Sequence, residues 1–139
     1  MPNRGMVDKP SYCQMEVFKN FLVRENFKFE ESEYGLHFAY QGANFFIANN
    51  DKDKLYLQLV MPAIYDCEKN NANKNFVLYA INKVNVETKA VKMLLMSNDE
   101  VWINIEMFLD TTPVLDDFFY RLLNILHGSR RSFYEYLKE

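Results

Sequence analysis

The chain has 139 residues, of which 49% are apolar and 25% are charged, a balance typical of a globular domain rather than a disordered chain. Its 19 acidic and 16 basic residues give a formal net charge of −3 at pH 7, which argues against a nucleic-acid-binding protein with a basic contact surface. No apolar run approaches the roughly 18 residues of a membrane-spanning helix, so membrane insertion is not predicted.

The ends of the domain can be predicted from composition. Residues 1–10, "MPNRGMVDKP", contain no apolar segment of the signal-peptide type and are predicted to form a flexible lead-in. Residues 11–139 are predicted to form a single α+β domain. Cys13 and Cys67 are far apart and form no CxxC pair, so both are predicted to be free buried thiols. Together these features predict a cytoplasmic protein.

A first helix is predicted over residues 11–26. Ser11 and Gln14 have the S-x-x-Q spacing of a capping box, in which each side chain bonds a free backbone N–H at the helix start. Met15, Phe18 and Leu22 follow at intervals of three and four residues, which places them on one helical face.

A meander of three or four antiparallel strands is predicted over residues 27–62. Apolar and polar residues alternate in "FKFEE" (27–31), "LHFAYQ" (36–41) and "LYLQLVM" (55–61), and "NFFIAN" (44–49) lies between the last two. Gly35 and Gly42 are predicted at turns because glycine tolerates positive φ. Pro62 is predicted to end the last strand because it cannot donate a hydrogen bond to a neighbouring strand.

A second helix, a hairpin and a third helix are predicted in the remaining half of the chain. The second helix covers residues 74–86, and the hairpin strands are "KAVKMLLM" (89–96) and "VWINIEMFL" (101–109), joined by "SNDE". The third helix is predicted to start with Thr112 as N-cap and Pro113 as first residue, with Asp116 and Asp117 favoured by the helix dipole. Gly128 is predicted to kink or end it, and a short helix over 129–137 continues from there.

The order of these elements predicts the fold class. It is α-β-β-β(-β)-α-β-β-α, with an antiparallel sheet of five or six strands and three helices. Helices separated in sequence from an antiparallel sheet are typical of a two-layer α+β domain.

The segment from Tyr79 to Leu109 carries a resemblance to known proteins. "INKVN" (81–85) stands near the end of the second helix and is followed by strand, short turn and strand, as in "KAVKMLL", "SNDE" and "VWINIEMFL". In this arrangement the chain resembles the YbjN-like family and the wider type III secretion chaperone-like fold, over roughly residues 11–137. The resemblance implies a bacterial, non-catalytic binding module; several such relatives are homodimeric chaperones or regulators that hold part of a partner chain.

Asn82 and Asn85 in that segment lie three residues apart and share one side of the helix. Asparagine tolerates the left-handed conformation and bonds nearby backbone, so the two residues are predicted to end the helix. Contact with a ligand is the alternative.

The residues that could carry catalysis or hold a metal form no recognised motif, and the chain is not predicted to be an enzyme. Its four glycines form no GxG phosphate loop, and no serine lies in a G-x-S-x-G turn. No cofactor and no metal site is predicted. The remaining polar residues are predicted to be solvated or to lie at turns and helix ends, namely His37, His127, Asp51, Asp53, Glu30, Glu31, Glu33, Arg130 and Arg131.

The most informative feature is the second face of the predicted sheet. In the hairpin, apolar residues also occur at the positions that point away from the core, where a solvated sheet face would carry polar ones. The predicted partner-binding residues are Leu94, Met96, Trp102, Phe108 and Tyr56, and Phe46 and Val60 are candidates to join them. Such a face requires a cover, which could be a helix of the same chain, a second subunit or a partner peptide.

The predicted function is a non-catalytic protein-binding module, chaperone-like or regulatory, that acts as a homodimer and binds a partner polypeptide. Binding to nucleic acid or to a membrane is not predicted. The alternative is a small apolar ligand bound between the third helix and the sheet, which requires a closed cavity of about 300 Å³ or more.

Overall fold

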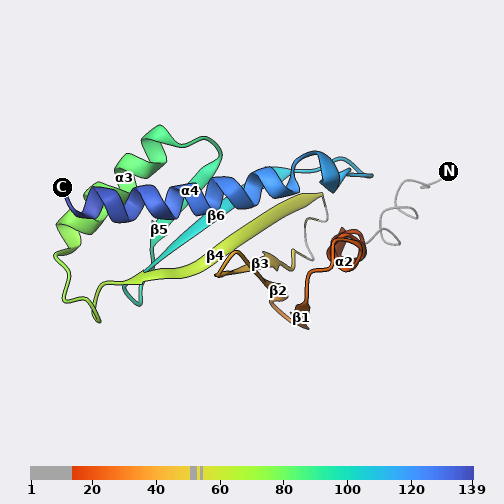
Figure 1. Ribbon diagram of the computed structural model, residues 1–139, viewed down its shortest axis with the longest axis horizontal. Helices are drawn as coiled ribbons and strands as arrows, with labels where there is room; N and C mark the ends of the chain where they lie inside the picture. The colour runs from red at the N-terminus through yellow and green to blue at the C-terminus, as the bar shows by residue number, and fades with distance from the viewer. Residues whose placement is uncertain (1–13, 51–52, 54) are drawn as a thin grey trace.

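The computed structural model describes residues 14–50, 53 and 55–139, and it has the predicted α+β architecture (Figure 1). The elements are α2 (Gln14–Arg24), β1 (Phe29–Ser32), β2 (Gly35–Tyr40), β3 (Ala43–Ala48), β4 (Tyr56–Asp66), α3 (Lys74–Glu87), β5 (Val91–Leu95), β6 (Glu100–Phe108), the 3-10 turn η1 (Leu115–Asp117) and α4 (Phe119–Leu137). The predicted lead-in and the Ser11 cap lie outside the described residues.

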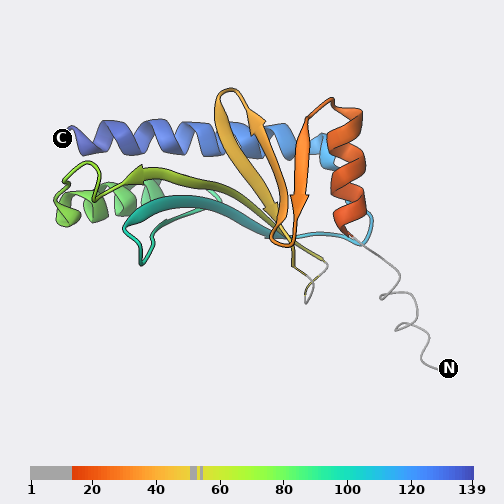
Figure 2. The same cartoon turned by 90° about the horizontal axis from the view of Figure 1, so that it is seen from below.

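The strands form one six-stranded sheet in the order β1-β2-β3-β4-β6-β5, and every neighbouring pair is antiparallel. β1 to β4 follow one another as a meander. α3 then carries the chain past β4 to the far edge, where β5 and β6 form a hairpin whose second strand pairs with β4. β3 and β4 pair only at Phe46–Val60 and Ile47–Leu59, and the two halves of the sheet cross steeply there (Figure 2).

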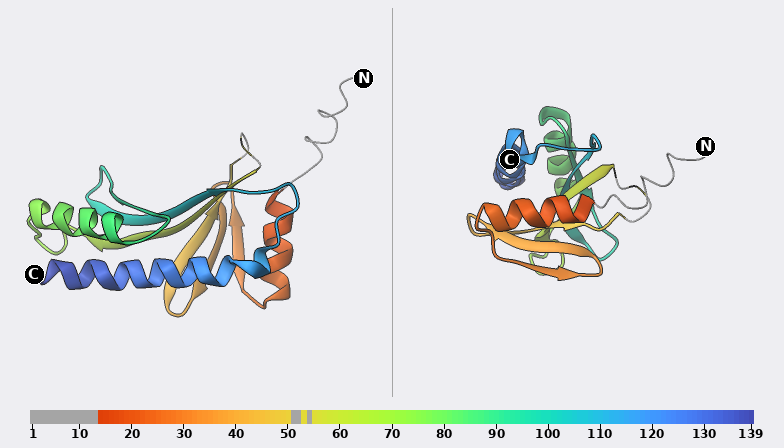
Figure 3. Two further views of the ribbon diagram at one scale, coloured as in Figure 1. Left: turned by 90° about the horizontal axis from the view of Figure 1, so that it is seen from above. Right: turned by 90° about the vertical axis from the view of Figure 1, so that its right-hand side faces the viewer.

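The core lies between one face of this sheet and the helices. α3 and α4 lie side by side on the same side of the sheet (Figure 3). The strands direct alternate residues to them, among which Leu57, Leu59, Ile103 and Ile105 are fully buried. α2 packs at the β1 end, where the Phe21 ring meets the Phe119 ring edge-on with centroids 5.0 Å apart. Among the described residues, no helix has the length and apolar character needed to cross a bilayer.

The join between α3 and β5 explains the paired asparagines. α3 continues to Glu87 and is capped at Thr88, so the prediction that Asn82 and Asn85 end the helix was wrong. Instead, the Asn85 side chain bonds the backbone of Met93 in both directions: Oδ1 accepts the Met93 N–H at 2.8 Å, and Nδ2 donates to the Met93 carbonyl at 3.1 Å. A helix side chain therefore pairs with the outer edge of β5 as a neighbouring strand would.

A helix also lies beside the opposite edge of the sheet. α2 runs beside β1 (Figure 2), and the Lys19 ammonium pairs with the Glu31 carboxylate of that strand at 3.0 Å. An exposed strand edge is a template for pairing with another chain. Each edge of this sheet therefore carries a contact from a helix of the same chain.

Two predicted boundaries were wrong because long-range packing outweighs local signals. β4 does not end at Pro62; it continues to Asp66 through an irregularity between Met61 and Tyr65, with Ala63 at φ 49°. A bulge tolerates proline because its residues are not all required to donate to a neighbouring strand.

The third helix also starts later than predicted. Thr112 and Pro113 precede it, the 3-10 turn η1 follows, and α4 begins at Phe119. Burial of Leu115 and Phe119 fixes this path. Gly128 neither kinks nor ends α4, which runs unbroken to Leu137.

The Asn85 contact predicts a clear difference between two similar substitutions. Asn85→Ala removes both hydrogen bonds to Met93 and should lower the free energy of unfolding by about 1–2 kcal/mol. Asn82→Ala is the matched control, because Asn82 is exposed on the same helix, and it should change stability by less than about 0.5 kcal/mol. Urea unfolding followed by circular dichroism measures both; equal effects would contradict the assigned role of Asn85.

Gly128 offers a stabilising substitution. A Cβ atom there meets nothing within 4 Å, so Gly128→Ala should stabilise α4 by about 0.5–1 kcal/mol through its better helix propensity. Gly35→Ala is the contrasting control: its Cβ would lie 2.0 Å from the Ile47 carbonyl oxygen at φ +146°, and the variant should be strongly destabilised. Thermal unfolding measures both, and a lower melting temperature for Gly128→Ala would contradict the unobstructed helix.

Candidate functional site

The face of the sheet that points away from α3 and α4 is here called the open face. The strand register can be followed straight across it through all six strands, because each residue pairs with the next one along. We call this line of side chains the central row: Glu30, His37, Phe46, Val60, Asn104 and Lys92. It alternates with the core positions of the same strands, so all six side chains lie on the open face.

No helix among the described residues covers the open face. α3 and α4 both lie on the opposite side of the sheet, and α2 lies at its β1 end (Figures 2 and 3). All five predicted partner-binding residues lie outside the cluster of core side chains. Within the part of the chain that the structure describes, a cover by the chain's own helices is therefore absent.

Three of the predicted residues, Trp102, Leu94 and Met96, form one group. Trp102 pairs across the strands with Leu94, and Met96 follows at the β5–β6 turn, where its backbone N–H bonds the Glu100 carbonyl at 2.8 Å. The indole meets the Phe46 ring edge-on with centroids 6.1 Å apart, and its Nε1 donates to the Glu100 carboxylate at 3.1 Å. This Trp102 group is half-buried and held by its own neighbours.

The other two predicted residues form a separate pair. Tyr56 and Phe108 lie opposite each other on β4 and β6, with ring centroids 5.5 Å apart. The Phe108 side chain is 79% exposed, more than any other large apolar residue described. Because Trp102 and Phe108 are six residues apart in one strand, about 20 Å separates the two groups.

A charged cluster lies between the two apolar groups. The Glu106 carboxylate accepts hydrogen bonds from the Tyr56 hydroxyl, from the Lys92 ammonium at 2.9 and 3.0 Å, and from the Asn104 amide at 3.4 Å. The Tyr56 bond, followed by the Lys92 contact, lowers the pKa of Glu106 below its usual value. The same bond raises the pKa of Tyr56 to about 12.

Two residues of the central row are buried although they lie on the open face. Val60 is 1% exposed and Asn104 is 5% exposed. The Asn104 carbonyl oxygen, Oδ1, has no hydrogen-bond donor within the described chain. A buried polar atom without a partner costs free energy, so Asn104 is an unfavourable feature of the single chain.

Sequence reasoning identified the outward residues by their period of two, but it missed how they combine. Glu30 and His37 were not assigned to this face, and the Glu106 cluster was not foreseen. Their placement depends on which strands are neighbours, and a register between β4 and β6 has no local signature.

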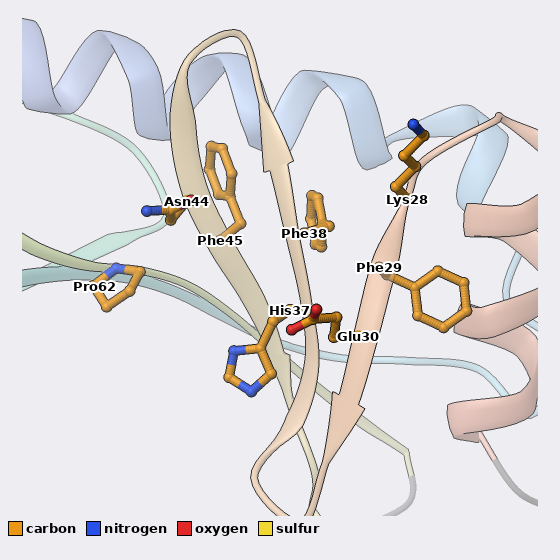
Figure 4. Close-up of a pocket in the computed structure, with 8 residues that line it drawn as sticks. All are labelled: Lys28, Phe29, Glu30, His37, Phe38, Asn44, Phe45 and Pro62. Atoms are coloured by element: carbon orange, nitrogen blue, oxygen red, sulfur yellow. The ribbon is translucent and has the colours of Figure 1, made fainter.

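A hollow of about 600 Å³ lies over β1, β2 and β3 (Figure 4). Its lining comes from side chains of those strands, from Lys28 just before β1 and from Pro62 of β4, with Glu30 and His37 close together on one side. The hollow is open to solvent, and the core rings Phe38 and Phe45 form part of its lining. It therefore gives no support to the alternative of an enclosed apolar ligand.

The groups that could carry chemistry are engaged elsewhere. His127 contacts the Tyr40 carbonyl at 3.0 Å through Nε2, and His37 contacts the Ser32 hydroxyl at 2.9 Å. Burial raises the pKa of the Cys67 thiol above its ordinary value, which disfavours the reactive thiolate. In residues 14–50, 53 and 55–139, no three His, Cys, Asp or Glu side chains come together as a metal site. Cys13 and Asp51 lie outside the described residues.

The Tyr56–Glu106 bond predicts a pH-dependent stability. A lowered Glu106 pKa contributes stability that is present above the unfolded pKa of about 4.3 and lost as pH falls through the folded value. A raised Tyr56 pKa contributes stability that is present below about pH 10 and lost as pH rises toward 12. The unaltered protein should therefore have a free energy of unfolding about 1 kcal/mol higher than that of the Tyr56→Phe variant near pH 7. The difference should be smaller at about pH 3 and at about pH 11.5. Urea unfolding of both proteins measures this, and a difference independent of pH would contradict it.

Comparison with known proteins gives a fold and no more specific relationship. No protein-family model and no curated protein matches the chain. Its structure is similar to the crystal structure of YbjN from E. coli, with a TM-score of 0.60 and 14% identity over 87% of this chain and 89% of that one. It is also similar to an uncharacterized protein from Methanothermobacter thermautotrophicus, with a TM-score of 0.58 and 12% identity over 89% and 96% of the two chains. The chain has a YbjN-like fold.

Proposed function

We propose that this chain is a non-catalytic protein-binding module that acts as a homodimer and holds a partner polypeptide. The observation that carries the proposal is the Trp102 group, an apolar and aromatic patch on a sheet face that no described helix covers. Tryptophan in a pocket of its own neighbours is the residue type that most often anchors a protein interface. The side chains around it are already held in place, so little conformational freedom is lost on binding.

The sheet edges favour the face as the binding surface. A partner could in principle add a strand to β1 or β5. The Asn85 side chain occupies the outer backbone groups of Met93 on β5, and α2 lies beside β1 with its Lys19–Glu31 ion pair. Side-chain contacts on the open face are therefore the more accessible route to a complex.

The polar cluster on the face suits recognition better than catalysis. A general base works best when its pKa lies near the working pH. The pKa of Glu106 is shifted the other way, and its oxygens already accept from Tyr56, Lys92 and Asn104. YbjN is described as a suggested transcription regulator. A regulatory role for this chain would act through protein contacts, since its net charge of −3 does not favour nucleic acid.

Substitution of Trp102 tests the proposal. Light scattering after size exclusion, over a range of concentrations, should give twice the chain mass of 16.6 kDa for the unaltered protein. Trp102→Ala should weaken self-association at least about tenfold, because it removes the central anchor of the patch. Circular dichroism and thermal unfolding should show that the variant is still folded.

Phe76→Ala is the matched control, because Phe76 is also aromatic and is 67% exposed, but lies on α3 on the other side of the sheet. It should leave the mass unchanged. A Trp102→Ala protein that keeps its mass, or that loses its fold with no separate effect on association, would count against the proposal.

A further inference from the structure

The central row is charged at its two ends and apolar at its middle. Glu30 on β1 is the negative end and has no ion-pair partner among the described residues, and Lys92 on β5 is the positive end. Phe46 on β3 and Val60 on β4 form the apolar middle of the row. The row spans five strand-to-strand steps, about 24 Å measured along the sheet.

Such a row is complementary to itself in one orientation. A two-fold axis that lies in the interface and runs along the strands, between β3 and β4, reverses the order of the row in the second copy. Glu30 then faces Lys92 of the second copy, and the Phe46 ring, which is half-buried, faces the middle of the second copy's row. An axis that runs along the row instead would place Glu30 against Glu30 and Lys92 against Lys92, and like charges disfavour that arrangement.

The remaining groups and the shape of the sheet allow this contact. Lys92 already contacts both oxygens of Glu106, but an ammonium group has three donors and can also bond a second carboxylate. A twisted sheet has a saddle-shaped surface. A saddle fits a copy of itself about a two-fold axis along the strands or across them, so shape permits both orientations and the charges select one.

We infer that a second copy of this chain covers the open face, related by a two-fold axis along the strands, with the central rows reversed against each other. The inference rests on the proposed function in one respect, that the open face binds a polypeptide. It goes further by committing to the occupant of the face and to a Glu30–Lys92 pair at each end of the interface.

Charge exchange at the ends of the row tests the orientation. Glu30→Lys places two like-charge pairs in the dimer, and so does Lys92→Glu. Each substitution should raise the dimer dissociation constant at least about tenfold. The increase should be smaller at high salt, which screens the repulsion. An equimolar mixture of the two variants should restore association, because a mixed dimer again has opposite charges at both ends. Sedimentation velocity of each variant and of the mixture measures this.

Two controls keep the result interpretable. Arg131→Glu and Glu135→Lys exchange exposed charges on α4, on the other side of the sheet, and should leave association unchanged. Lys92→Glu also loses the ion pair with Glu106, so thermal unfolding is measured for every variant. If that variant does not fold, Lys92→Gln introduced into the Glu30→Lys chain gives the same test: it removes the repulsion and should tighten association relative to Glu30→Lys alone.

The outcomes separate this inference from the proposed function. Weakened single variants with a restored mixture support it. A dimer that Trp102→Ala disrupts but the charge variants do not would overturn the reversed-row orientation and leave the open face as the binding surface. A dimer that neither set of variants affects would overturn both proposals. A chain that stays monomeric at all concentrations would overturn this inference and the homodimer of the proposed function, and would leave only a partner polypeptide as occupant of the face.

Discussion

The alternation of side chains along a β-strand is the constraint on which the rest of this molecule depends. α3 and α4 both pack against one face of the sheet, so each strand that supplies the core must also supply a second set of residues that no helix meets. In β6 the buried Val101, Ile103 and Ile105 alternate with Trp102, Asn104 and Glu106. The core therefore fixes where the open face lies, and the identity of the intervening residues decides what that face can contact.

The side chains of the open face are held in place by contacts within the single chain. Trp102 is held by Phe46 and Glu100, and Tyr56 is held by Phe108 and Glu106. These contacts limit the rotamers available to the aromatic side chains in the isolated chain. A surface of this kind binds with a smaller loss of side-chain entropy than one whose residues are free in solution.

Much of the fold could be predicted from local patterns. Apolar residues repeat every two residues in a strand and about every 3.6 residues in a helix, and both repeats can be read within a short segment. The second helix was predicted over 74–86 and is found at Lys74–Glu87, and the outward position of Trp102 follows from parity within its strand. Local signals failed where distant packing decides the outcome. The proline signals at Pro62 and Pro113 were outweighed by a bulge against β6 and by the burial of Leu115.

The candidate site depends even more on distant pairing. Asn85 was noticed as part of a motif, yet its partner lies eight residues later on another element, and the sequence does not reveal that it bonds a strand edge. The central row could not be foreseen for the same reason. It exists only because β6 inserts between β4 and β5, an order that reverses the sequence order of the last two strands.

That insertion has a consequence for how the protein is made. Tyr56 pairs with Phe108, a separation of 108 − 56 = 52 residues, so β4 acquires its second neighbour only after most of the chain has been synthesised. β1 to β3 can form hairpins as soon as they leave the ribosome, whereas one side of the long β4 has unpaired backbone groups until β6 emerges. Strands in this condition are prone to pair with other chains. The protein should therefore be most vulnerable to aggregation during translation, between the emergence of β4 and that of β6, and slower elongation over residues 67–108 would lengthen that interval.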